Sequence, residues 1–184
     1  MNSELDVLTD VVARLEGAGI DYMLTGSLAM SVYATPRMTR DIDLVVELAG
    51  LDPGCIVALF SPEYYVDAEA VGSAIAARGF FNAFHVAKLV KVDLIVRKDE
   101  AFEREKFSRR QRRELGGRPV WVIGKEDLVL SMLVWAAPTE SAFQLRDVQS
   151  LLASGVDEDY LHAWSVKLGV DALLRKCTDA GYDS

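Results

Sequence analysis

Apolar and polar residues alternate with a period that changes along the chain, and these changes predict its elements. Apolar residues recur at helical spacing between residues 4 and 16, which predicts an amphipathic helix. The short apolar run 21–26 predicts a strand that ends in a turn, and residues 27–34 have helix-forming composition. Aliphatic and β-branched residues dominate 41–48, so we expect a second strand there.

The remaining pattern predicts two regions. Further helices are expected at 52–60, 69–78 and 99–113, and further strands at 80–87, 88–97 and 118–124. The strands at 80–87 and 88–97 are expected to pair as neighbours. Downstream of Gly124 the pattern is helical throughout. We therefore expect an α/β (α+β) core over 1–123 and a C-terminal helical segment over 124–184, which packs on the core because about 60 residues make a marginal independent domain.

Composition narrows the classes of protein that fit this pattern. The chain has 184 residues, of which 51% are hydrophobic and 26% charged, the ordinary mix of a globular domain. Its formal net charge of −8 argues against a general nucleic-acid coat protein. The N-terminus is acidic rather than basic, and no apolar run approaches the roughly 20 residues that span a bilayer. A cytoplasmic protein with no membrane partner is the expectation.

Two aspartates stand one residue apart at the start of the second predicted strand. Because successive side chains of a strand point to opposite faces, Asp41 and Asp43 are expected on the same face. Two neighbouring carboxylates repel each other, and a hard cation such as Mg²⁺ relieves the repulsion and brings substrate phosphates as further ligands. Asp93, another acid within an aliphatic strand, is the candidate third carboxylate.

A Gly-Ser turn between the first predicted strand and the helix after it is a candidate phosphate site. A turn that opens a helix presents unpaired backbone N–H groups to an anion, and Gly26 allows close backbone approach. A triphosphate held at Gly26 and Ser27, with its metal on Asp41 and Asp43, can be attacked in line by a hydroxyl. Asp93 would help to deprotonate that hydroxyl or hold it on a second metal.

Plainer interpretations stay open for each of these residues. Ser27 can act only as a helix N-cap. Asp41 can cap its strand while Asp43 pairs with Arg37 or Arg40. Asp93 can be a surface residue of a one-sided sheet.

The order of these residues resembles the signature of the DNA polymerase β-type nucleotidyltransferase superfamily. That signature is Gly-Ser after a short strand, a spacer, Asp-x-Asp, and a later single Asp on a strand. The stretch RMTRDIDLVV carries Arg37 and Thr39 before the two aspartates. This Arg-x-Thr-x-Asp-x-Asp form is similar to that of the abortive-infection-type (AbiEii-like) bacterial nucleotidyltransferase branch.

The resemblance implies a fold, a cofactor and a set of site residues. The fold would be a nucleotidyltransferase-type mixed sheet flanked by helices, and the cofactor Mg²⁺, with Mn²⁺ as the alternative ion. The catalytic residues and metal ligands would be Asp41, Asp43 and Asp93. The nucleotide-binding residues would be Gly26, Ser27, Arg37, Thr39 and Arg40.

Two functions follow as hypotheses. The first is an enzyme that transfers a nucleoside monophosphate from an NTP to a hydroxyl of tRNA, a protein or a small molecule. The second is a catalytically weak binding protein of the same fold that acts as a regulatory partner of a cognate toxin or antitoxin. Arg146 and Asp147 match a pair found in the tail of the resembled branch, whereas Ser131 or Met132 stands near the place of its lysine, which favours the second.

A basic stretch at residues 104–118 is a further candidate for RNA contact. Its cations can follow a nucleic-acid backbone, or they can form a solvated face that neighbouring glutamates offset. The sequence leaves both interpretations open.

Overall fold

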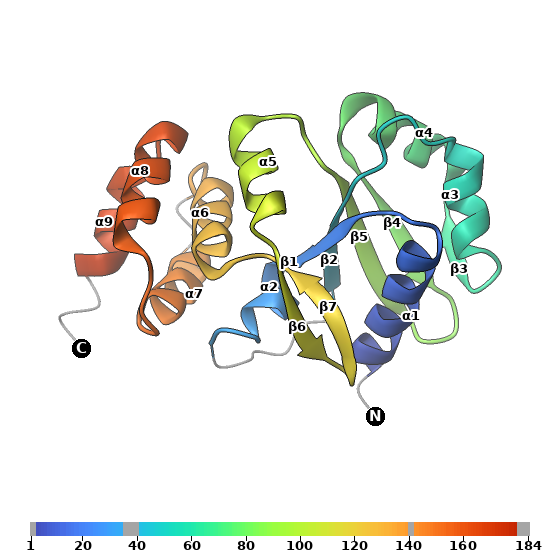
Figure 1. Cartoon of the computed structure of the whole chain (residues 1–184), viewed down its shortest axis with the longest axis horizontal. Coiled ribbons are helices and arrows are strands. Elements are labelled where there is room, and N and C mark those ends of the chain that lie inside the picture. Colours follow the sequence, from blue (N-terminus) through green and yellow to red (C-terminus); the bar gives the residue numbers. More distant parts are fainter. Residues whose placement is uncertain (1–2, 35–40, 140–141, 180–184) are drawn as a thin grey trace. The chain divides into compact units, whose positions relative to one another are not determined.

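The computed structural model describes residues 3–34, 41–139 and 142–179 (Figure 1). The helices in these ranges are α1 (Ser3–Gly17), α2 (Gly26–Met30), α3 (Pro53–Phe60), α4 (Ala68–Ala77), α5 (Ala101–Ser108), α6 (Lys125–Ala136), α7 (Ala142–Leu152), α8 (Glu158–Leu168) and α9 (Asp171–Asp179). The strands are β1 (Tyr22–Thr25), β2 (Asp41–Val46), β3 (Tyr64–Val66), β4 (Phe80–His85), β5 (Val90–Val96), β6 (Gln111–Leu115) and β7 (Arg118–Val122).

The strands form one mixed sheet in the order β3-β4-β5-β2-β1-β7-β6. Strand β2 runs parallel to β5, and β1 runs parallel to β7. The other neighbouring strands are antiparallel, including β4 and β5, which confirms the expected pairing of these two segments. The expected α/β class with a mixed sheet flanked by helices is confirmed.

One face of the sheet is packed and the other is less buried. Along β5 every second side chain from Val90 to Val96 is buried, while Lys91, Asp93 and Ile95 between them are partly exposed. Helix α1 contacts β2 and β5, and α4 contacts β4 and β5. The aliphatic side of each central strand thus contributes to the core, whereas its polar side is partly exposed and can carry a binding site.

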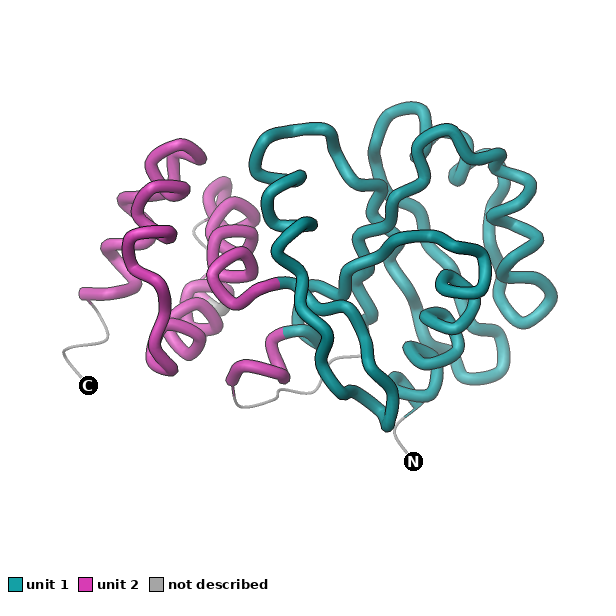
Figure 2. The backbone as a smooth tube through the Cα atoms, viewed as in Figure 1, with its two compact units in different colours: residues 1–29, 37–123 teal, residues 30–36, 124–184 magenta. Residues whose placement is uncertain are grey.

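The chain contains two compact units (Figure 2). The first comprises residues 1–29 and 37–123 and holds the sheet; the second comprises 30–36 and 124–184. Within the second unit, α6 packs on α7 and α8, and α9 packs on the same two helices. The expected packing of the helical segment on the core stays a prediction. Within the described part of the chain, no helix is both long and apolar enough to cross a membrane.

The structure corrects the helix predicted at 99–113. Helix α5 ends at Ser108, and residues 111–115 form strand β6, which pairs with β7. Gly116 and Gly117 have φ values of 61° and 77° and join β6 to β7 as a two-residue hairpin turn, so they do not simply end a helix. The helix predicted at 27–34 is also shorter, because α2 ends at Met30, and the short strand β3 was not predicted.

Candidate functional site

The pairing of β2 with β5 brings the three predicted acids to one face of the sheet. In the parallel register Asp43 lies opposite Asp93, and Asp41 lies opposite Lys91. On the other side of β2, Thr25 of β1 is the register partner of Asp43. Acids that are about 50 positions apart in the sequence thereby become direct neighbours.

The turn at Gly26 lies directly against the carboxylate of Asp43. Gly26 follows the last residue of β1 and has a φ of 66°, a conformation that side chains other than glycine rarely adopt. A Cβ atom at this position would lie 2.1 Å from Oδ2 of Asp43. The backbone of Gly26 therefore approaches Asp43 more closely than any other residue type would permit.

A lysine ammonium already lies among the acids. Nζ of Lys91 is 3.0 Å from Oδ2 of Asp93 and 3.7 Å from Oδ1 of Asp41. The other oxygen of Asp93 accepts a hydrogen bond from the side-chain amide of Asn82, its register partner on β4. The hydrogen bond to Asp93 raises the pKa of Lys91, so this cation is held firmly in its charged form.

Asp43 is the acid whose ionisation is most disturbed. Burial raises its pKa first, the charges of Asp93 and Asp41 raise it further, and Lys91 opposes them, with a resulting pKa of about 6. A carboxylate in this setting needs additional positive charge to stay ionised. The group of hard oxygen donors therefore suits Mg²⁺ in its chemistry.

The acids offer suitable donors but no finished metal cage. Among the described residues, no group of three or more His, Cys, Asp or Glu side chains is arranged to hold a metal ion. The ammonium of Lys91 contacts two of the candidate ligands directly. Binding a divalent ion to this set would require that ammonium to give way.

The structure locates only part of the predicted nucleotide-binding set. Ser27 is the second residue of α2, immediately after Gly26. Arg37, Thr39 and Arg40 lie outside the described residues.

Three site neighbours, Thr25, Asn82 and Lys91, were not predicted. Lys91 had a detectable signal, because it stands two residues before Asp93 and so shares its face. Thr25 and Asn82 join the site only through strand register, which the sequence alone does not specify.

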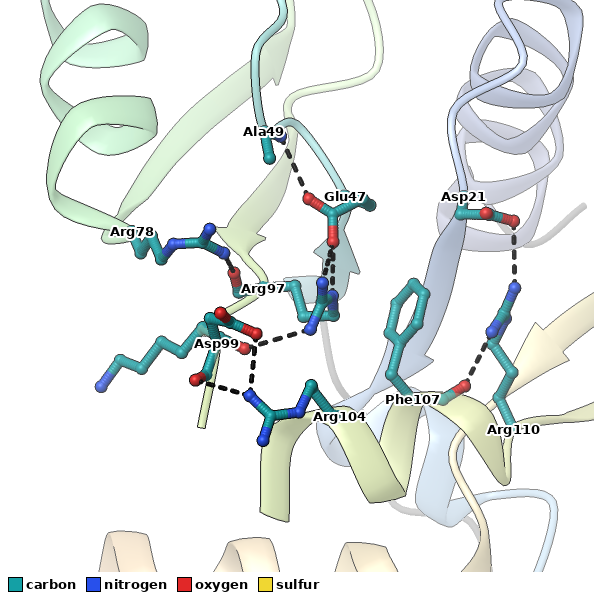
Figure 3. Close-up of polar contacts among 10 residues, drawn as sticks. Asp21, Glu47, Ala49, Arg78, Arg97, Asp99, Arg104, Phe107 and Arg110 are labelled. Carbon is teal, nitrogen blue, oxygen red and sulfur yellow. Dashed lines mark hydrogen bonds and ion pairs between the residues drawn. The ribbon is translucent and has the colours of Figure 1, made fainter. Parts of the chain in front are cut away.

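A second polar cluster lies at the opposite ends of β2 and β5 (Figure 3). Arg97 pairs with Glu47 there, and Nη1 of Arg78 donates to the carbonyl of Arg97 at 2.8 Å. A pocket of about 340 Å³ at this end is lined by Asp21, Glu47, Arg97, Arg104, Phe107, Ser108 and Arg110. It includes none of the three candidate acids.

The arginines of this cluster are already paired within the chain. Arg104 contacts Asp99 at 2.9 Å and Arg110 contacts Asp21 at 3.0 Å. Farther along the predicted basic stretch, Arg112 and Arg118 both pair with Glu16. The cluster is best explained as an ion-pair network that joins the ends of several elements.

Comparison with solved structures identifies the fold. The antibiotic-resistance factor ANT(2'')-Ia, in its solution structure, matches with a TM-score of 0.59 and 16% identity over 96% of this chain and 93% of its own. An antigenic nucleotidyltransferase-like protein from Paracoccidioides brasiliensis matches with a TM-score of 0.66 and 16% identity over 99% and 90%. The lincosamide antibiotic adenylyltransferase LnuA matches with a TM-score of 0.53 and 16% identity over 82% and 98%.

The comparisons establish the fold of the chain. No protein-family model matches the sequence, and no curated protein matches it either. Because the structural neighbours share only 16% of their residues with this chain, they establish that it has the nucleotidyltransferase fold, as the sequence resemblance implied.

Proposed function

We propose that this protein transfers a nucleoside monophosphate from an NTP to a hydroxyl acceptor, with Mg²⁺ or Mn²⁺ as cofactor. The observation that supports this most is the register of β2 and β5, in which Asp43 lies opposite Asp93 while Gly26 abuts Asp43. The nucleotidyltransferase fold of the chain is consistent with it.

Each group has a role in this proposal. Asp41 and Asp43 hold the metal, and the backbone at Gly26 and Ser27 binds the β- and γ-phosphates. The metal, when bound, neutralises the charge that develops on the phosphate oxygens. Asp93 accepts the proton of the acceptor hydroxyl, whose oxygen forms a bond to the α-phosphorus as the bond to the β-phosphate oxygen breaks. Pyrophosphate leaves.

The test combines nucleotide binding with label transfer. Purified protein is incubated with each α-³²P-labelled NTP, Mg²⁺ and separate pools of tRNA, protein and small molecules. We expect transfer into one pool, and a loss of about 100-fold or more for Asp43→Asn, because asparagine removes the charge of a proposed ligand to the metal that stabilises the transition state. Glu69→Gln, an exposed acid in the first turn of α4, is the matched control and should retain full transfer. Equal transfer by the parent and Asp43→Asn would refute the proposal.

A second candidate function is the catalytically weak partner of a toxin or antitoxin within the same fold. It is favoured by Asp93, whose carboxylate is occupied by Lys91 and Asn82. It is also favoured by the tail, because the lysine that the abortive-infection-type branch carries there has no counterpart near Ser131. Nucleotide binding that Asp43→Asn abolishes, with no transfer into any pool by the parent, would support it over the enzyme.

A further inference from the structure

Strand register continues the site onto β4 and β3, beyond the acids. Phe84 is the register partner of Lys91, and Phe80 is the partner of Ile95, so both share the face of Asp93. Tyr65 of β3 is in turn the partner of Phe84. Asn82, which donates to Asp93, stands between the two phenylalanines on the same face.

The rings of all three aromatic residues are exposed to solvent. Tyr65 is 67% exposed, Phe80 is 64% exposed and Phe84 is 36% exposed. Single exposed apolar residues are ordinary, but aromatic side chains grouped on one face commonly mark a binding surface. We call Tyr65, Phe80 and Phe84 the aromatic face.

We propose that the aromatic face binds the acceptor, and that the acceptor is an uncharged or cationic small molecule that carries a hydroxyl and an apolar ring surface. This inference rests on the proposed function. In an in-line displacement the attacking and leaving oxygens lie on opposite sides of the phosphorus. Gly26 and Ser27 follow β1 on one side of the acids, so pyrophosphate leaves there and the hydroxyl approaches from the β4 side, across the aromatic face.

The charges of the described residues on this face disfavour a polyanionic acceptor. Asp41, Asp43 and Asp93 lie on the same face, where Lys91 contacts Asp41 and Asp93. The whole chain carries a net charge of −8, and Lys88 beside β4 is paired with Asp6 at 3.0 Å. Recognition of RNA requires several cations that neutralise phosphates, whereas the described residues of β2, β4 and β5 on this face supply one, Lys91. An apolar ring surface stacks on such aromatic side chains and needs no neighbouring cations to do so.

The experiment measures binding directly, so that it does not depend on catalysis. Phenyl β-glucoside, which carries hydroxyls and a ring, is compared with methyl β-glucoside, which carries hydroxyls alone, by saturation-transfer NMR. We expect the phenyl probe to bind more tightly. Phe84→Ser and Phe80→Ser should each weaken it roughly 2- to 10-fold, the range for one aromatic contact. Leu51→Ser, which alters an exposed apolar residue in the loop between β2 and α3, should change nothing.

Three results that do not depend on catalysis would overturn the inference. The first is phenyl-probe binding that neither phenylalanine substitution alters. The second is tRNA binding at about 150 mM salt that these substitutions weaken, which would assign the rings to base stacking. The third is a dimer, seen by analytical ultracentrifugation, that they dissociate, which would assign the rings to a second copy of this chain.

The proposed function is tested by a separate measurement, the binding and transfer of nucleotide. Binding of NTP with Mg²⁺ should be unchanged in Phe84→Ser and lost in Asp43→Asn. A parent that binds the phenyl probe at the aromatic face but transfers no label would refute the transferase and leave the surface standing. A parent that transfers label equally well after Phe80→Ser and Phe84→Ser would refute the surface alone.

Discussion

Replacing Gly26 with alanine separates backbone strain from disturbance of the site. A non-glycine residue at a φ of 66° costs about 1–2 kcal/mol. The new Cβ would also meet Oδ2 of Asp43 at 2.1 Å and its Cγ at 2.8 Å, so the carboxylate must move. A displacement of about 1 Å in a reacting group commonly costs about 100-fold in rate.

Gly19→Ala provides a matched control for the backbone term. Gly19 has a φ of 68°, and a Cβ there would meet nothing within 4 Å. Gly19→Ala should lose about 1–2 kcal/mol in the free energy of unfolding, measured by urea denaturation, and Gly26→Ala should lose at least as much because its Cβ also meets Asp43. This corresponds to a fall of roughly 2–8 °C in melting temperature for a chain of this size.

Only Gly26→Ala should lose function. The rise in melting temperature on adding NTP with Mg²⁺ should be abolished in Gly26→Ala and retained in Gly19→Ala. Label transfer, where the parent shows it, should fall about 100-fold in Gly26→Ala alone. If the two variants respond equally to nucleotide and metal, the contact between Gly26 and Asp43 has no functional importance and the reasoning is wrong.

Three further predictions concern charge and burial. Lys91→Met should lower the melting temperature of the metal-free protein, because it removes a part-exposed ion pair worth about 1 kcal/mol or less. It should enlarge the rise in melting temperature on adding Mg²⁺, because the competing ammonium is gone. Scanning fluorimetry measures both melting temperatures. At Glu16, burial alone would raise the pKa, but hydrogen bonds from Arg118 and other donors lower it, so its stabilisation is present above the ordinary pKa of 4.5 and is lost as pH falls through the lower folded value. Glu16→Gln should therefore be less stable than the parent at neutral pH, and in urea titrations the difference should shrink as the pH falls below 4.5 and the acid of the folded parent becomes protonated. Tyr160→Phe should destabilise the helical unit by about 1–3 kcal/mol in urea unfolding, because the hydroxyl donates at 2.6 Å to Asp127, which is fully buried.

Local pattern was enough to predict most elements and the facing of the acids. The alternation around Asp41, Asp43 and Asp93 placed each acid on the polar side of an otherwise aliphatic strand, as the burial of β2 and β5 confirms. Such a pattern depends only on the two-residue period of a strand, so it can be predicted without knowing which strands pair.

Tertiary pairing explains what the sequence did not predict. Residues 111–115 are polar and charged and fit a helix by composition, but they become an edge strand because the Gly116–Gly117 turn folds them onto β7. Asn82 and Thr25 reach the acids through register with β5 and β2. Neither the β6–β7 hairpin nor the position of Asn82 and Thr25 beside the acids is marked by a local sequence pattern.

The register that assembles the candidate site is secured at the far ends of its two strands. Val46 lies opposite Val96, and the residues that follow them, Glu47 and Arg97, form an ion pair. The backbone N–H of Arg97 also donates to the carbonyl of Val46 at 2.9 Å. A slip of two residues would preserve the buried face of both strands but set Asp43 against Lys91 or Ile95 instead of Asp93. Hydrophobic burial alone does not discriminate between these registers, whereas the pairing of Glu47 with Arg97 does. The second polar cluster, shown in Figure 3, therefore has a structural role, because it helps to fix how the acids are aligned. It favours the alignment in which Asp43, the acid next to Gly26, stands beside Asp93.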